Sequence, residues 1–204
     1  MTDSAQIYLK TPEQFDLDAF APLLTSILDT TPVACLRLSL NASDASALSR
    51  AADGLREIAH AHDVAIVIDD HFRLVETHGL DGVHLTDGSR TIREARKVLG
   101  PEAIIGAHCG GSRHDGITAA EIGVDYISFG PLADQGLGDS TVAAPDLFQW
   151  WSEMIEVPVV AEGGITDATL AGIKDFADFV CLGTEIWTAE NPQAELTRII
   201  ALLA

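Results

Sequence analysis

The stretch VPVVAEGGITD, residues 157–167, joins an apolar run to a helix start through two glycines. Its first half is rich in β-branched residues, which is typical of a strand buried on both faces. Gly163 and Gly164 follow, and Thr166 with Asp167 is a helix-capping signal. Glycine lets another group approach the backbone, and the first amides of a helix attract anions. The stretch therefore predicts either a phosphate-binding loop or a tight strand-to-helix turn without a ligand.

The same alternation of apolar run and helical stretch recurs along the chain. Runs that predict strands lie at 7–9, 33–40, 64–68, 82–85, 103–107, 124–129, 157–161 and 179–183. Segments that predict helices lie at 13–29, 44–62, 71–79, 90–99, 115–122, 145–154, 166–175 and 192–203. Eight alternations fit a (β/α)8 TIM barrel or a doubly wound sheet, and the count favours the barrel. We expect a single α/β domain over residues 1–204.

Composition and charge restrict the partners. The 204 residues include 12 Lys and Arg against 31 Asp and Glu, a formal charge of −19, which argues against nucleic acid and anionic membranes. No apolar run approaches ~18 residues, and the first ten residues do not resemble a signal peptide. Three isolated cysteines, Cys35, Cys109 and Cys181, favour a reducing compartment, so we expect a cytoplasmic protein. Trp150 and Trp151 predict internal packing, with a homo-oligomer contact as the alternative.

The last two strand-to-helix connections predict an anion site. Barrel sites are built from the loops that follow the strands, and phosphate commonly binds after strands seven and eight. These loops hold residues 162–166 and 183–187 here, so we expect a small phosphorylated substrate. The predicted phosphate-binding residues are Gly163, Gly164, Gly183 and Thr184. Glu162 and Glu185 would bring carboxylates close to that anion, so we expect both to point away; otherwise the site prefers another ligand.

Carboxylates also follow two earlier strands. Asp69 and Asp70 come after the third strand, and Asp87 comes after the fourth. Carboxylates that face one pocket are most simply held together by a divalent cation, which predicts Mg²⁺. In the alternative interpretation, Asp69 and Asp70 cap the short helix at 71–79, and Asp87 forms a turn with Gly88.

Two histidines differ in their predicted surroundings. His84 lies inside a strand and is expected to be a hydrogen-bonded core residue. His108 ends the fifth strand and is expected at the mouth of the barrel. Because imidazole titrates near neutral pH, His108 is a candidate catalytic acid or base.

Five segments, in this order and spacing, resemble the family of thiamine-phosphate synthase and thiazole tautomerase. They are IDDHFRLVETHGLDGVHL (68–85), IIGAH (104–108), GVDYISFGP (123–131), VPVVAEGGIT (157–166) and CLGTEIW (181–187). The resemblance extends from about residue 33 to residue 187. It implies the synthase reaction, which joins a hydroxymethylpyrimidine diphosphate to a thiazole phosphate and releases diphosphate. Mg²⁺ and cationic side chains would stabilise the charge of the departing diphosphate.

The functional residues of the family match this chain unevenly. Asp70 matches a metal-binding aspartate, and Arg37 matches an arginine of the second strand, which makes it a candidate catalytic residue. The departures are Asp69 for asparagine, His71 for arginine, Ser39 for lysine, Ser89 for a second metal-binding aspartate, His108 for serine, and residues 135–138 for Thr-x-Thr-Lys. Asp87 lies two residues from Ser89 and is a candidate replacement ligand.

The departures fall on the diphosphate half of the expected site. The glycines of the thiazole-phosphate half are kept, whereas two lysines, an arginine and a metal carboxylate of the diphosphate half are replaced. Missing cations leave the charge of the diphosphate unstabilised, so we expect weak Mg²⁺ binding and slow synthase turnover. The alternatives are a thiazole tautomerase that uses His108 and a non-catalytic barrel that binds thiazole phosphate.

Overall fold

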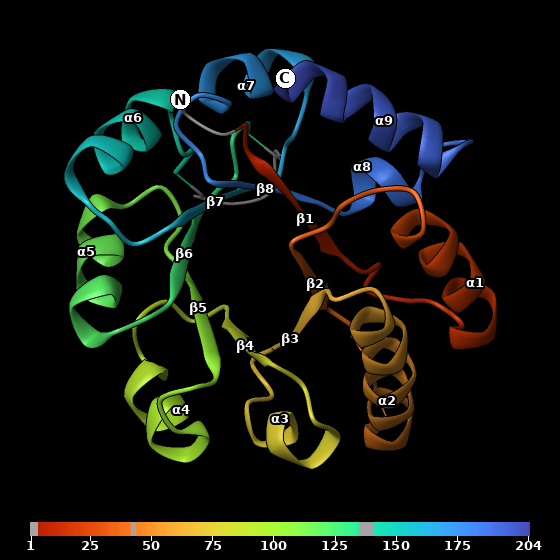
Figure 1. Cartoon of the computed structure of the whole chain (residues 1–204). Coiled ribbons are helices and arrows are strands. Elements are labelled where there is room, and N and C mark those ends of the chain that lie inside the picture. The colour runs from red at the N-terminus through yellow and green to blue at the C-terminus, as the bar shows by residue number, and fades with distance from the viewer. Residues whose placement is uncertain (1–3, 42–43, 135–140) are drawn as a thin grey trace.

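The computed structural model describes residues 4–41, 44–134 and 141–204. Its strands form a closed barrel in chain order, each parallel to both neighbours, with β8 closing onto β1. Figure 1 looks along this barrel and shows the helices arranged around it. The predicted (β/α)8 barrel is therefore confirmed, and the doubly wound sheet is excluded.

The strands coincide with the predicted apolar runs. They are β1 (Gln6–Lys10), β2 (Cys35–Leu38), β3 (Ala65–Asp69), β4 (Gly82–Leu85), β5 (Ile104–His108), β6 (Tyr126–Phe129), β7 (Val159–Glu162) and β8 (Phe179–Leu182). Several strands extend further at their carboxyl ends than the apolar runs predict. β1 includes Lys10 and β7 includes Glu162, because parallel pairing continues after the hydrophobic residues end.

Helices follow the strands in the predicted places. They are α1 (Leu17–Leu28), α2 (Ala45–Ala61), α3 (Arg73–His78), α4 (Ile92–Leu99), α5 (Arg113–Ile122), α6 (Pro145–Met154), α7 (Asp167–Ile173), α8 (Thr184–Trp187) and α9 (Pro192–Leu203). The helix α8 was expected to be part of a loop. This single turn is closed by bonds from Trp187 N–H to Gly183 O (3.1 Å) and from Thr188 Oγ1 to Thr184 O (2.7 Å).

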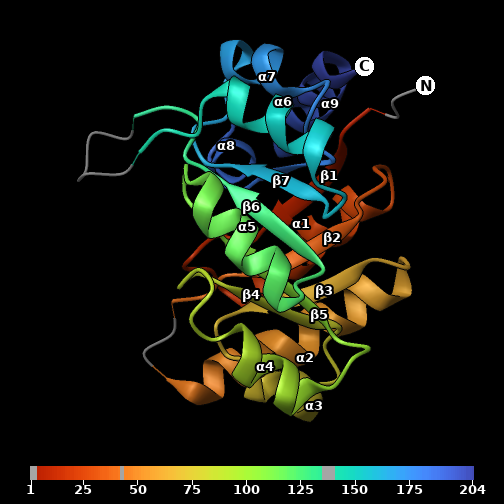
Figure 2. The same ribbon diagram turned by 90° about the vertical axis from the view of Figure 1, so that its left-hand side faces the viewer.

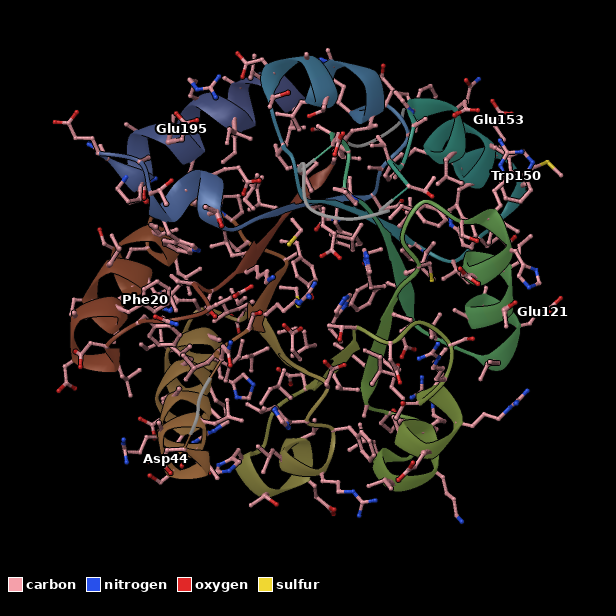
Figure 3. All side chains as sticks on the ribbon, turned by 180° about the vertical axis from the view of Figure 1, so that it is seen from behind. Phe20, Asp44, Glu121, Trp150, Glu153 and Glu195 are labelled. Atoms are coloured by element: carbon pink, nitrogen blue, oxygen red, sulfur yellow. The ribbon has the colours of Figure 1, made fainter. Side chains whose placement is uncertain are left out.

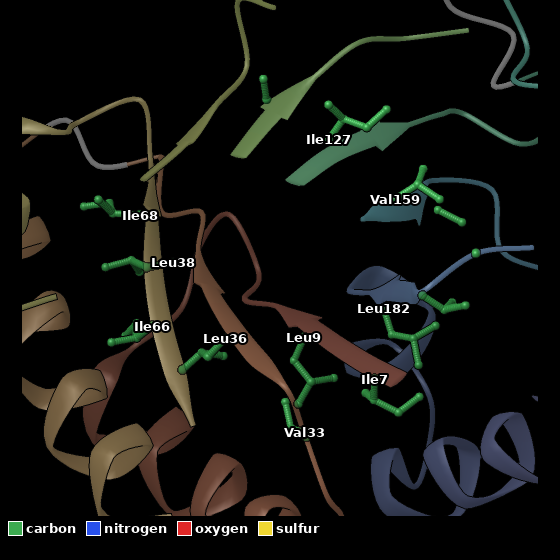
Figure 4. Packing of buried hydrophobic residues seen from close by; sticks show 14 of the residues in the cluster. Ile7, Leu9, Val33, Leu36, Leu38, Ile66, Ile68, Ile127, Val159 and Leu182 are labelled. Atoms are coloured by element: carbon green, nitrogen blue, oxygen red, sulfur yellow. The ribbon is translucent and has the colours of Figure 1, made fainter. Parts of the chain in front are cut away.

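Side chains alternate between the two sides of each strand, as the period of a β-strand requires. Leu9, Leu36 and Ile66 belong to the large apolar core between the barrel and its helices, and Figure 4 shows them turned toward the helices. Tyr8, Cys35 and Val67 are their sequence neighbours and belong to the smaller interior cluster. Every second residue of a strand therefore faces the barrel interior, which is where the polar residues of the strand ends meet.

The two tryptophans of α6 pack against the protein itself. Trp151 is fully buried, with its ring 5.2 Å from that of Phe129. Trp150 is partly buried, and the guanidinium of Arg113 lies 4.7 Å from its ring centre. The packing interpretation of this pair is confirmed.

The acidic charge is spread over the outer surface. Figure 3 shows Asp44, Glu121, Glu153 and Glu195 around the rim of the helical ring, away from the barrel axis. Within the described ranges, no helix is long and apolar enough to cross a membrane. The chain leading into β1 and helix α8 lie at opposite ends of the barrel (Figure 2), so the carboxyl ends of the strands open on the α8 side.

Candidate active site at the barrel mouth

Arg37 is the centre of the polar network at the mouth. Its side chain is only 4% exposed, and its Nε donates to Asp69 Oδ1 at 2.5 Å while Nη1 donates to Glu162 Oε2 at 2.6 Å. Burial by itself lowers the pKa of Arg37, but the two carboxylates outweigh burial and raise that pKa above its usual value. Arg37 therefore stays charged and is already neutralised from two sides.

Glu162 connects Arg37 to the candidate acid–base residue His108. Its Oε1 lies 2.6 Å from His108 Nδ1 and accepts a hydrogen bond from Ser128 Oγ at 3.0 Å. Burial raises the pKa of Glu162, but Arg37 and the bond with His108 more than offset it and hold the pKa well below its usual range. The contact joins the ring of His108 to Arg37 through one ionised carboxylate.

We call Arg37, Asp69, His108 and Glu162 the mouth layer. Glu162 was expected to point away from the predicted anion, and that expectation is wrong, because Glu162 lines the same cavity as the predicted phosphate-binding residues. The predicted strand ended at residue 161, whereas β7 continues through Glu162 and directs it inward against Arg37.

A second set of polar groups in the barrel interior is buried and uncharged: Tyr8, His84 and Tyr126, which we call the floor layer. The two tyrosine hydroxyls are 2.8 Å apart, and His84 Nδ1 lies 3.0 Å from the Tyr126 hydroxyl. Burial, reinforced by the nearby charge of Arg37, lowers the pKa of His84 well below its usual value, so the ring is neutral. His84 is thus the hydrogen-bonded core histidine that was expected, although its buried Nε2 has no partner among the described residues.

The three aspartates proposed as metal ligands have separate partners. Asp69 is bound to Arg37, and Asp70 accepts hydrogen bonds from Thr86 N–H (2.7 Å) and Oγ1 (2.6 Å). Asp87 accepts from the hydroxyl of Thr91. The alternative in which Asp69 and Asp70 cap the following helix is wrong, because Asp69 binds Arg37, Asp70 binds Thr86, and α3 begins after Phe72 without a side-chain cap.

The aspartates also open onto different cavities. Asp69 and Asp70 line a cavity of about 260 Å³ with Ser39 and His71, whereas Asp87 lines another. Within the described part of the chain, no three metal-ligating side chains are grouped together. These residues do not assemble a ligand set for Mg²⁺, so a cation here would depend on substrate oxygens and water.

Two larger cavities meet at His108. One, of about 670 Å³, is lined by residues of the loops after β4 and β5, including Arg90, Gly110 and Gly111. The other, of about 470 Å³, is lined by Lys10 and by residues of the loops after β7 and β8. His108, Gly130 and Pro131 line both, so molecules in the two cavities would be in contact beside the imidazole.

The cavity of about 470 Å³, which we call the smaller cavity of the two that meet at His108, is lined by all four residues predicted to bind phosphate: Gly163, Gly164, Gly183 and Thr184. Gly163 and Gly164 have φ of 75° and 71°, which side chains rarely adopt. The amide of Gly183, however, donates to Glu185 Oε2 at 3.1 Å, so it is not open. The expectation that Glu185 points away is wrong, since its carboxylate folds back over the start of α8.

Two cationic residues of the mouth, Lys10 and Arg90, were not predicted from the sequence. The predicted first strand ended at residue 9, one residue before Lys10. Lys10 pairs with Arg37 in the strand register, and its side chain is partly exposed. Arg90 lies in the loop after β4. The one sequence feature that could have marked it as a site residue is its position between a strand and the following helix. The stretch 135–138, where the family has threonines and a lysine, lies outside the described residues.

Together, the closed parallel barrel and the polar residues at its carboxyl end define the class of (β/α)8 proteins that place their sites at this face. The chain belongs to the thiamine monophosphate synthase family, whose model matches residues 7–186. The family resemblance seen in the sequence is thereby confirmed.

Individual relatives agree with this assignment. The chain is 41% identical over 189 residues to a thiamine-phosphate synthase of Rhodospirillum centenum, covering 92% of this chain and 91% of the relative. A second, of Erythrobacter litoralis, is 37% identical over 166 residues, covering 79% and 78%. A solved thiamine phosphate pyrophosphorylase from Pyrococcus furiosus has the same fold, with a TM-score of 0.79 at 20% identity over 97% of this chain and 96% of that one.

Proposed function

We propose that this protein is a thiamine-phosphate synthase, which joins a hydroxymethylpyrimidine diphosphate to a thiazole phosphate. The observation that carries the proposal is the pair of cavities that meet at His108, each with a cation in its lining. A condensation needs two substrates side by side in one mouth, and the family match runs through the strands and loops that build both cavities.

The two halves of the reaction are assigned by the chemistry of the linings. The thiazole phosphate occupies the smaller cavity, where Lys10 and the amides around Gly164 offer positive charge and N–H groups. The pyrimidine diphosphate occupies the larger cavity, where Arg90 lies among glycines of the loop after β5. The bond between the pyrimidine methylene and the diphosphate oxygen breaks, its electrons leave with diphosphate, and the thiazole nitrogen forms the new C–N bond.

Mg²⁺ enters this proposal only as a weakly held ion. When bound with the diphosphate, it would supply charge neutralisation for the leaving group. Asp87 is the proposed ligand nearest to that substrate, because it lines the larger cavity while Asp69 and Asp70 do not. Lys10 and Arg90 are the side chains of this chain that replace some of the cations missing at Ser39 and His71.

The test is a direct assay for thiamine phosphate with both substrates and Mg²⁺. We expect Lys10→Ala to raise KM for the thiazole phosphate about tenfold, and Arg90→Ala to raise KM for the pyrimidine diphosphate to a similar extent, since charge-assisted contacts contribute about 1.5–3 kcal/mol. Arg93→Ala, an exposed arginine of α4, is the control and should change neither constant. Absence of product with the unaltered protein would refute the synthase assignment.

A tautomerase-like proton transfer is the second candidate, and the observation that favours it is the 2.6 Å contact between His108 and Glu162. A carboxylate-supported imidazole at the junction of two cavities is suited to moving a proton on a bound thiazole. His108→Gln separates the two functions. It should abolish tautomerisation, whereas the synthase reaction should keep most of its rate.

We also propose a cytoplasmic location. Support comes from Cys35, Cys109 and Cys181, which are free and buried thiols, as is usual in a reducing compartment.

A further inference from the structure

The carboxylate of Glu185 occupies part of the smaller cavity in which we expect the phosphate of the substrate to bind. Its Oε2 accepts from the amide of Gly183 at 3.1 Å, and its Oε1 accepts from the amide of Ile165 at a longer 3.4 Å. One donor belongs to the loop after β8 and the other to the loop after β7. The carboxylate therefore joins the two loops that border this cavity, and it is partly buried there.

A carboxylate and a phosphate make the same demands on these donors. Both are anions that accept hydrogen bonds from backbone N–H groups, and an amide that donates to Glu185 cannot donate fully to a second anion. Two negative groups placed at the same amides also repel each other. A phosphate can use the donors of both loops only after the carboxylate has turned away.

The surroundings make such a displacement a local event. Glu185 stands in the single turn α8, and its backbone bonds do not involve the carboxylate. Lys10 lines the same cavity and is paired only loosely, at 3.9 Å, with the exposed Glu13. Its charge is therefore available to an anion that replaces the carboxylate.

We propose that Glu185 is an internal competitor for the substrate's phosphate, a proposal that rests on the phosphate site of the proposed function. The carboxylate lowers the affinity of every phosphate for this cavity by the same factor, because each must displace it. Free inorganic phosphate has only the anion contacts to offset that cost and is kept out. A phosphate ester that also buries a ring in the cavity of about 470 Å³ remains a ligand.

The experiment is calorimetric titration of inorganic phosphate and of the thiazole phosphate, each alone, into the full chain. Glu185→Ala should bind both ligands at least tenfold more tightly, and by the same factor for each. Glu185→Gln keeps an oxygen for the two amides but loses the charge, so it should give a smaller gain. Glu190→Ala removes the same charge from an exposed position of the same segment and should leave both affinities within twofold.

The outcomes distinguish this inference from the proposed function. Unchanged affinities in both Glu185 variants, with thermal unfolding showing that they are folded, would overturn it, as would no binding of either ligand to any variant. Tighter binding in Glu185→Ala sustains the inference even if the synthase assay shows no turnover. Turnover in that assay together with unchanged affinities would sustain the function and reject the inference.

Discussion

The mouth layer and the floor layer stand on different strands of the same barrel, the first on β2, β3, β5 and β7 and the second on β1, β4 and β6, and their buried polar groups are satisfied in different ways. The mouth layer contains full charges, and Arg37 is compensated by Asp69 and Glu162. The floor layer contains hydroxyls and a neutral imidazole that bond to one another. Full charges are kept at the mouth, beside the two cavities that meet at His108, and are absent from the floor layer. The comparison indicates that both layers contribute to stability, whereas only the mouth layer carries charge beside the cavities.

The largest effect is expected from breaking the mouth layer. Arg37→Met keeps the length of the side chain but removes the cation that compensates two partly buried carboxylates, which should cost about 3–5 kcal/mol of unfolding free energy. Urea denaturation followed by circular dichroism measures it. Arg73→Met is the matched control, since Arg73 pairs with Glu94 at 2.8 Å on the exposed surface and should lose less than about 1 kcal/mol. Similar small losses in both variants would mean that the mouth layer does not support the fold.

A smaller effect is expected from breaking the floor layer. Tyr126→Phe removes one hydroxyl and leaves the Tyr8 hydroxyl and His84 Nδ1 without their partner. Unsatisfied buried polar groups cost about 1–3 kcal/mol, so the loss should lie in that range. The double variant Tyr8→Phe with Tyr126→Phe should lose less than the two single changes added together, because the two hydroxyls share one interaction. Strict additivity would show that the two hydroxyls do not interact.

The smallest expected effect is the change in unfolding free energy with pH, which also distinguishes the floor layer from the mouth layer. The pKa of His84 is lowered in the folded protein, so below about pH 6.5 the unfolded chain takes up a proton that the folded chain refuses. The stability due to the neutral ring is complete above that pH and is lost as the pH falls, with a slope of at most about 1.4 kcal/mol per unit. His84→Gln should reduce this slope between about pH 5 and 6.5, whereas His114→Gln, an exposed control, should not.

The mouth layer is expected to respond in a more acidic range. The pKa of Glu162 is held low in the folded state, so its contribution is present above the unfolded value of about 4.3 and is lost only as the pH falls further. Two separate acid limbs in the stability profile would therefore distinguish the layers. A single limb that His84→Gln leaves unchanged would show that folding does not lower the pKa of the floor histidine.

Part of the site was predictable from the chain because it depends on local patterns. His84 sits between apolar neighbours on a strand, which marks it as internal, and His108 ends a strand, which places it at the mouth of a parallel barrel. The roles of Asp70 and Asp87 were not predictable in this way. Each carboxylate could cap a helix, bind a metal or accept a hydrogen bond from a nearby threonine hydroxyl, and the neighbouring sequence does not show which of these it does.

The sequence by itself determined the barrel, the order of its strands and the face at which polar groups gather, because hydrophobic periodicity and turn residues act over a few neighbours. Only the tertiary structure decided how the charges at that face are paired. Arg37 meets Asp69 across 32 positions and Glu162 across 125, and Glu185 turns back onto the amide of Gly183. Those choices depend on strand register and barrel closure, which bring side chains from distant parts of the chain within a few ångströms of each other.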